Sequence, residues 1–212
     1  MAEQGILAIW NDVRAGDEAV FEAWFQSEHL QERLGVPGFL FGRRHQAISG
    51  GSGYFNFYVV QSPDVLTSRP YLERLDNPTP LTRRVMSGIF INMSRTLCHR
   101  AARRGAFRGA YAVTARFNDA PDTTALAALL DELVKEPVIA AGELWIATDS
   151  AGQPVSMEEK LRGGDKKIRA CLMIDTLRER DAEQFGARFA KDFPGADVGV
   201  FRVLCQLGNG DA

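Results

Sequence analysis

The stretch GDEAVFEAWFQSEHLQERLGV (16–36) decides how the chain begins to fold. Its apolar residues have the spacing of an amphipathic helix, and Phe21, Phe25 and His29 follow one another at intervals of four on a single face. A Val-Pro-Gly sequence at 36–38 ends the helix, because proline and glycine do not continue it. We therefore predict a helix that packs this face, including its histidine, against a neighbouring layer.

The elements around this helix give the first half of the chain the order strand, helix, two strands, helix, strand. The two middle strands flank SGGSG (49–53), a hairpin signal because glycine adopts the backbone angles of tight turns. An irregular or short helical connector is predicted at 76–85. The strands are predicted at 5–13, 39–48, 54–62 and 89–99, and the second helix at 63–75.

The same order of elements recurs in the second half, after the basic segment RTLCHRAARRGAFR (95–108). GILAIWND (5–12) corresponds to AYAVTARFND (110–119) in pattern rather than identity. A long polar loop is predicted at 150–165. The strands of this half are predicted at 107–117, 137–149, 167–177 and 196–207, and its helices at 123–136 and 178–193.

Two βαββαβ units form two ferredoxin-like, four-stranded antiparallel sheets, each with both helices on one face. The other face needs cover, and in GILAIW (5–10) the residues of both faces are apolar. We therefore predict an α+β protein in which residues 1–104 and 105–212 are tandem ferredoxin-like repeats, packed sheet to sheet as an intrachain barrel. Two sheet edges would stay exposed, and they would allow a homodimer.

The composition argues against several classes of function. Of the 212 residues, 25 are basic and 27 acidic, and the net charge of −2 gives no field that would attract nucleic acid or an anionic membrane. The basic segment is expected to be a solvated linker. No apolar run approaches the ~18 residues that span a bilayer, and the first residues do not resemble a signal peptide. Cys98, Cys171 and Cys205 fit neither a disulfide framework nor a zinc site, so a cytoplasmic protein is expected.

The segment DEAVFEAWFQSEHLQERLGVPGFLFGRRH (17–45) resembles the first helix and second strand of the dimeric α+β barrel proteins, especially their EthD-like branch. The close match covers this segment, and the rest of the chain matches in its order of elements. The resemblance implies an α+β barrel. Several enzymes of that superfamily act on small aromatic or lactone compounds. The features that carry the match are Trp24-Phe25, His29 and Pro37-Gly38-Phe39.

His29 is the candidate catalytic residue, because an imidazole with a pKa near 6.5 works as a general acid or base. Relatives keep a ligand cleft between helices and sheet, which is the side that this helix face would occupy. Glu32 at i+3, or less favourably Glu28 at i+1, could fix the tautomer of the ring. The structural alternative is a half-buried histidine bound to a backbone carbonyl. No second histidine lies at i+4, so a metal site is not expected.

The strands supply further candidates for substrate binding. Asn56 and Tyr58 share one strand face by its period of two, and they could hydrogen-bond a substrate carbonyl or oxyanion. Aromatic rings could form a wall beside them. The alternative is that the polar tips reach water or pair with surface acids. The full candidate set is Trp10, Trp24, Phe25, Arg43, Asn56 and Tyr58.

The expected function is that of an enzyme that handles a small aromatic or lactone-like metabolite by acid/base chemistry at His29, without a nucleotide or metal cofactor. Haem is the cofactor alternative, and only through His29, because the later helices contain no histidine. The pocket is expected in residues 1–104, because the first helix of the second half has no Trp, His or Phe. A non-catalytic binding or accessory protein with the same cleft is the alternative function.

Overall fold

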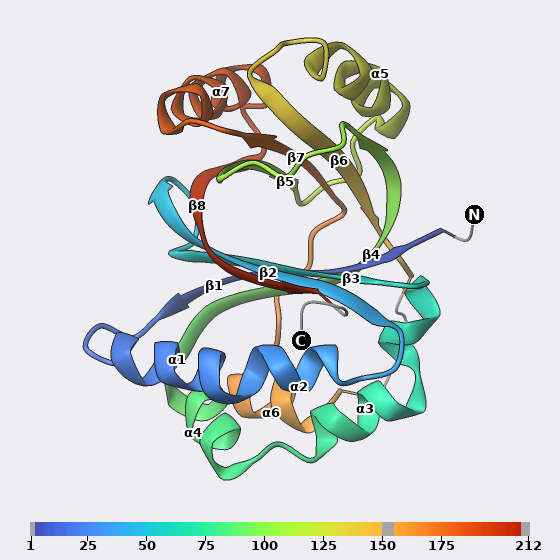
Figure 1. The fold of residues 1–212 in the computed structure, drawn as a ribbon. Coiled ribbons are helices and arrows are strands. Elements are labelled where there is room, and N and C mark those ends of the chain that lie inside the picture. The colour runs from blue at the N-terminus through green and yellow to red at the C-terminus, as the bar shows by residue number, and fades with distance from the viewer. Residues whose placement is uncertain (1–2, 150–154, 209–212) are drawn as a thin grey trace.

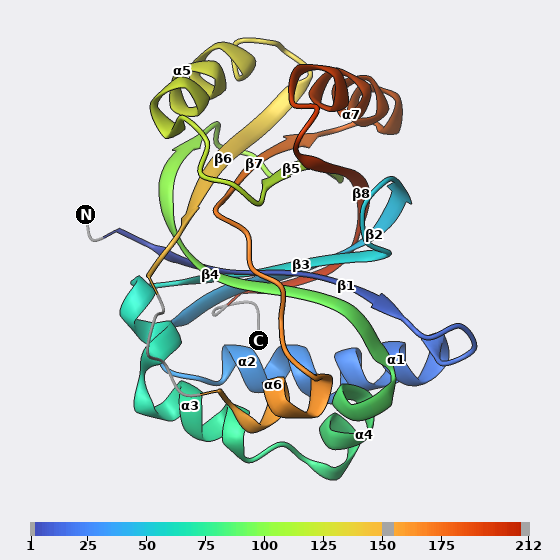
Figure 2. The ribbon, with the colours of Figure 1, turned by 180° about the vertical axis from the view of Figure 1, so that it is seen from behind.

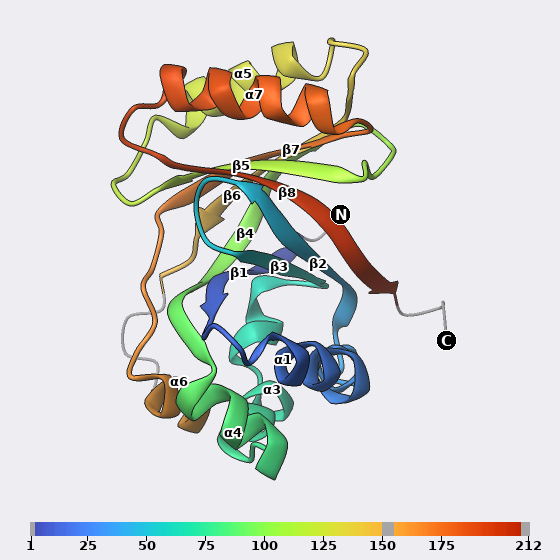
Figure 3. The same cartoon turned by 90° about the vertical axis from the view of Figure 1, so that its left-hand side faces the viewer.

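The computed structural model describes residues 3–149 and 155–208, and in it eight antiparallel strands close into a barrel (Figure 1). Around the barrel the strands follow the order β1-β3-β2-β8-β5-β7-β6-β4. Helices cover the barrel on two opposite sides (Figure 3). The strands are β1 (Gly5–Val13), β2 (Phe39–Ser49), β3 (Tyr54–Val60), β4 (Phe90–Arg104), β5 (Tyr111–Phe117), β6 (Ile139–Ala147), β7 (Ala170–Thr176) and β8 (Asp197–Gly208).

The α+β barrel predicted from the sequence is confirmed, and paired strand edges close it. The first half contributes the sheet β4-β1-β3-β2 and the second half the sheet β6-β7-β5-β8. β2 pairs with β8 and β4 pairs with β6, so the two sheets join along both edges. The sequence predicted two exposed sheet edges through which a homodimer could form. Since every described strand has a neighbour on each side, a homodimer would have to use another surface.

The second helix differs from the sequence prediction, because residues 63–75 hold a 3₁₀ turn before it and its first turn contains Pro70. The connector at 76–85 is mostly helical, in agreement with the short helical form predicted for it. In the first half the helices are α1 (Glu18–Trp24), the π-helix η1 (Phe25–His29), α2 (Leu30–Leu34), the 3₁₀ helix η2 (Pro63–Thr67), α3 (Arg69–Asp76) and α4 (Pro80–Gly88). In the second half they are α5 (Thr123–Leu133), α6 (Met157–Arg162) and α7 (Glu179–Asp192).

α6 comes from the second half but lies in the helix layer of the first, against α3 and α4 (Figure 2). The sequence predicted a polar loop over this segment, of which residues 150–154 lie outside the described residues. The side chain of Ser156 caps α6 by accepting a hydrogen bond from the backbone N–H of Glu159, and Gly163 ends it in the left-handed conformation. None of the helices in the described ranges is both long and apolar enough to cross a membrane.

Side chains alternate between the helix layers and the barrel interior. In β1, Leu7 and Ile9 face the helices, whereas Ile6, Ala8 and Trp10 face the interior. This arrangement explains why both faces of the strand are apolar. Large rings fill the interior, among them Trp10, Phe55, Phe57, Trp145 and Phe201.

The basic segment is not the solvated linker that the sequence predicted, because three of its arginines surround a buried carboxylate. Glu143 in β6 is 1% exposed, and its carboxylate lies 2.9 Å from Arg100 Nε and 3.4 Å from Arg103 Nε. Arg108 Nη1 lies 3.6 Å away, and Trp145 Nε1 donates a hydrogen bond of 2.8 Å. The pairing of β4 with β6 brings these residues together.

We expect Glu143→Gln to lower the free energy of unfolding by about 2–4 kcal/mol, because it leaves three partly buried arginines without their buried carboxylate. Chemical denaturation at pH 7 measures the loss. Glu136→Gln is the matched control, since its ion pair with Arg188 (2.8 Å) joins side chains that are 43% and 44% exposed. The control should cost less than ~1 kcal/mol, and equal losses in the two variants would contradict the prediction.

Candidate functional site

The opening helix carries His29 into a buried position. α1 continues through the π-helix η1 into α2, and the wider π turn ends at His29. Phe21, Phe25 and His29 lie on the buried face, as predicted, and His29 is 6% exposed. The centroid of its imidazole lies 4.1 Å from the indole of Trp24 and 5.4 Å from the ring of Phe25. π turns inside α-helices are frequent at functional sites.

Glu28, one of the two carboxylates predicted to orient His29, binds α4 instead. It accepts hydrogen bonds from the hydroxyls of Thr79 and Thr82, the second at 2.6 Å. Thr82 in turn accepts a hydrogen bond of 2.9 Å from Trp24 Nε1. Glu28 therefore acts through α4 to hold the indole against the imidazole.

The second predicted carboxylate, Glu32, forms an ion pair of 3.2 Å with Arg74. His29 Nδ1 is buried and has no hydrogen-bond partner among the described residues. This nitrogen therefore binds neither a carboxylate nor a backbone carbonyl, the partner expected for a purely structural histidine. Its partner has to come from a water or a ligand.

His29 lines a small cavity between the helix layer and the sheet, which we call the inner cavity. Phe25, His29 and Arg33 line it from the helix, and Asn56 and Tyr58 line it from β3. Its volume is about 20 Å³, and a water needs about 10–15 Å³ measured in the same way. The inner cavity therefore has room for about one water. α3, β4 and α6 complete its wall with Tyr71, Leu75, Arg95, Glu158 and Arg162.

Several buried polar atoms at the inner cavity lack hydrogen-bond partners among the described residues. They are His29 Nδ1, Asn56 Oδ1, Tyr58 Oη and Arg33 Nη1. The amide nitrogen of Asn56 donates to Asn11 Oδ1 at 3.2 Å, which leaves its oxygen free. A buried polar atom without a partner costs about 1–3 kcal/mol. Packing alone does not explain such a group, whereas a bound water or ligand would satisfy it.

Burial and nearby cations keep the imidazole neutral. Desolvation, followed by the charges of Arg33, Arg162 and Arg44, lowers the pKa of His29 well below its ordinary value. At neutral pH the ring is therefore uncharged, and one of its nitrogens carries a lone pair that can accept a hydrogen bond. Burial also raises the pKa of Tyr58, so that its phenol keeps its proton and can donate a hydrogen bond.

Two predicted binding residues, Trp10 and Arg43, lie on the other face of the sheet from His29. Trp10 stacks on Phe55 inside the barrel, with ring centroids 4.9 Å apart. Arg43 is buried and forms an ion pair of 3.1 Å with Asp175 of β7. The structure therefore does not bring these two residues to the inner cavity.

The sequence prediction missed the residues that close the inner cavity. Arg33 Nη2 lies 2.5 Å from Glu158 Oε1, and both side chains are buried. Arg162, one turn further along α6, lies 3.7 Å from the same carboxylate and 2.8 Å from Asp165. The buried Arg33–Glu158 ion pair thus binds α6 to α2, the pairs of Arg162 lie within the α6 segment, and the second half of the chain supplies a wall of this site.

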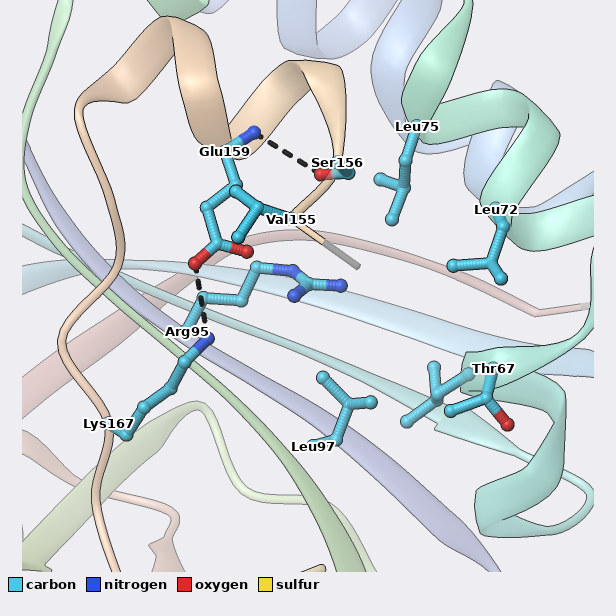
Figure 4. A pocket seen from close by; sticks show the side chains of 10 residues that line it. Thr67, Leu72, Leu75, Arg95, Leu97, Val155, Ser156, Glu159 and Lys167 are labelled. Atoms are coloured by element: carbon cyan, nitrogen blue, oxygen red, sulfur yellow. Dashed lines mark hydrogen bonds and ion pairs between the residues drawn. The ribbon is translucent and has the colours of Figure 1, made fainter. Parts of the chain in front are cut away.

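A second hollow, open to the surface, adjoins the inner cavity, and we call it the outer pocket (Figure 4). Its volume is about 120 Å³. Leu75 and Arg95 line both spaces and form the partition between them. In Figure 4 the guanidinium of Arg95 extends into the space between α6 and the leucines of α3. Its Nη2 donates a hydrogen bond of 2.8 Å to Tyr71 Oη.

The geometry at His29 does not fit haem. Pockets for ligands of drug size occupy about 300–1,000 Å³. The inner cavity and the outer pocket are smaller than that even when they are taken together. In the described part of the chain, no three His, Cys, Asp or Glu side chains converge as metal ligands.

No family model and no curated protein matches the chain. Solved structures do match it. An anthrone oxidase-like protein superposes with a TM-score of 0.66 at 11% identity, over 100% of this chain and 95% of that one. A candidate monooxygenase of Fusobacterium nucleatum gives a TM-score of 0.58 at 10% identity, over 98% and 95% of the two chains. A candidate chlorite dismutase gives 0.56 at 10% identity, over 97% and 96%. At these identities the likeness concerns the fold, which is that of the dimeric α+β barrel proteins.

The acid sensitivity of the fold should depend on His29. Because folding lowers the pKa of His29 below its ordinary value of 6.5, unfolding takes up a proton at lower pH, and stability falls as the pH falls through that range. Compared with His29→Gln, the wild-type protein should lose up to about 1.4 kcal/mol more per pH unit below pH ~6. Urea denaturation between pH ~7.5 and pH ~5 measures this, since that range extends about one unit above and about one and a half units below the ordinary pKa. Parallel pH profiles of the two proteins would contradict it.

Proposed function

We propose that the protein is an enzyme that moves a proton on a small aromatic or lactone-like metabolite through His29, without a nucleotide or metal cofactor. The unpartnered atoms His29 Nδ1, Asn56 Oδ1 and Tyr58 Oη around one buried cavity carry the proposal. In it the neutral imidazole is the base and Tyr58 donates to a substrate oxygen. Asn56 accepts from a substrate hydroxyl, since its amide nitrogen already binds Asn11.

The buried cations favour removal of a proton from the substrate. A positive imidazole by itself would be disfavoured beside Arg33 and Arg162. Transfer of a proton from substrate to His29 creates an anion at the same time, and that anion is attracted both to the imidazolium and to the guanidinium groups. Since the site is buried, these attractions are stronger than they would be in water.

The volumes of the two hollows support a substrate with a single ring. Leu75 and Arg95 separate the inner cavity from the outer pocket. Movement of these two side chains would join spaces of about 20 and 120 Å³, which together approach the ~150 Å³ of a cavity that holds benzene. A one-ring compound would then reach His29.

The solved neighbours, among them an anthrone oxidase-like protein and a candidate monooxygenase, support an enzyme of this fold. We further propose that residues 1–104 carry the cleft and that 105–212 serve as its packing partner, with α6 of the second half completing the wall. In this proposal the two repeats arose by duplication of one unit, and the chain lies in the EthD-like branch. Consistent with this, leucines of α5 fill the equivalent helix layer of the second half. Three free cysteines support a cytoplasmic location.

Deuterium exchange would test the proposal without knowledge of the later reaction steps. The protein is incubated in D₂O with a panel of one-ring lactones, phenols and aromatic ketones, and ¹H NMR follows loss of acidic C–H signals and formation of products. We expect His29→Gln to slow the exchange about 100-fold or more, and Tyr58→Phe to slow it about 100-fold. His99→Gln, at a half-exposed histidine of β4, is the matched control and should leave the rate unchanged. An active His29→Gln variant would refute the role of His29.

The alternative, a non-catalytic binding or accessory protein, is favoured by one observation. The inner cavity has room for about one water, and His29 is packed between Trp24 and Phe25. In that case a compound of the panel would shift the NMR signals of the protein and undergo neither exchange nor turnover. Turnover that requires His29 would exclude it.

A further inference from the structure

We infer that the compound bound at this site carries a carboxylate, and that Arg95 binds the carboxylate at the partition between the outer pocket and the inner cavity. The inference names the substrate class for the proposed function and rests on that function for what happens after binding. Binding itself can be tested independently of turnover.

Arg95 is a buried cation without a matching anion. It is 8% exposed, and among the described residues it forms no ion pair, since the hydroxyl of Tyr71 is the side-chain partner of its guanidinium. A buried charge is costly unless it is paired. The planar guanidinium has five N–H donors, so further donors remain for a carboxylate that binds through both oxygens.

The charges around Arg95 leave it unbalanced. Glu158 pairs with Arg33 and Arg162, and Asp165 pairs with Arg162. Across the outer pocket, Lys167 Nζ lies 3.8 Å from Glu159 Oε1, an ion pair that Figure 4 marks with a dashed line. The four cations of this region are Arg33, Arg95, Arg162 and Lys167, and its three carboxylates are Glu158, Glu159 and Asp165. Within residues 3–149 and 155–208, Arg95 is therefore the cation of this set without an ion pair, and Glu158 and Asp165 act on its charge only from a longer distance.

The rest of the outer pocket fits an apolar ring. Leu66, Leu72 and Leu97 line it beside Arg95. A ring among these leucines would place its carboxylate on the guanidinium. Because Arg95 also lines the inner cavity, the carboxylate can stay bound to it while the ring passes Leu75 toward His29.

Two probes of the same shape separate the charge from the ring. ¹⁹F NMR titration compares 4-fluorobenzoate with its neutral analogue 4-fluorobenzamide. The wild-type protein should bind the benzoate about 10-fold to 100-fold more tightly, and Arg95→Met should abolish that preference and still bind the amide. Arg69→Met, at an arginine whose side chain is 89% exposed, is the matched control and should behave like the wild type. A preference for the benzoate that survives in Arg95→Met, or equal binding of both probes by the wild type, would overturn the inference.

A second set of variants tests the location and separates this inference from the proposed function. Leu72→Trp fills the outer pocket and should abolish binding of both probes, and unchanged binding would refute the location. His29→Gln should keep the binding of 4-fluorobenzoate and its dependence on Arg95. If His29→Gln keeps full turnover while Arg95→Met loses the benzoate preference, the proposed function fails and the carboxylate site stands. If only His29→Gln has an effect, the carboxylate site fails.

Discussion

Two strand pairings, β2 with β8 and β4 with β6, determine what can be buried in this protein. They close the sheets into a barrel, so both faces of the strands are withdrawn from water. Polar side chains on the inner face are thereby also withdrawn from water, and Glu143 is paired there with the arginines of the basic segment. Closure also decides which residues are available for a ligand, since the site described above lies on the outer face of the first sheet, under its helices.

Burial is the largest influence on the ionisation of the enclosed groups. It lowers the pKa of His29 on the helix side and raises the pKa of Asp175 inside the barrel to about 6, even though Arg43 opposes the second effect. Both groups are pushed toward their neutral forms. The difference between them lies in their partners, because Asp175 has its arginine at 3.1 Å whereas His29 Nδ1 has none in the described part of the chain.

The sequence predicted those features that depend on local patterns. The spacing of Phe21, Phe25 and His29 defined the buried helix face, and the period of two placed Asn56 and Tyr58 toward it. Trp10 and Arg43 could not be assigned to a face by the same means, because residues on both faces of their strands are buried.

The wall supplied by α6 was harder to predict. Ser156, three residues before Glu159, has the pattern of a helix N-terminus and could have indicated the helix itself. Nothing local could have indicated that α6 packs on the other half, because its ion pair with Arg33 joins residues 125 positions apart. Its short length also left little apolar periodicity to detect.

The π turn at Phe25–His29 determines how the length of this helix can change between homologues. Each residue of an α-helix advances the chain by about 100° around the axis, and a π turn accommodates an additional residue. Trp24 and Arg33 are nine residues apart, a separation that would put them on opposite sides of a regular helix, and the π turn keeps both on the buried side. Deleting one residue of this turn would leave a regular helix whose two ends keep their relative orientation, whereas inserting a residue elsewhere in the helix would turn one end by about 100°. Homologues that lack one residue here should therefore keep the faces of α1 and α2 and lose only the wider turn that ends at His29.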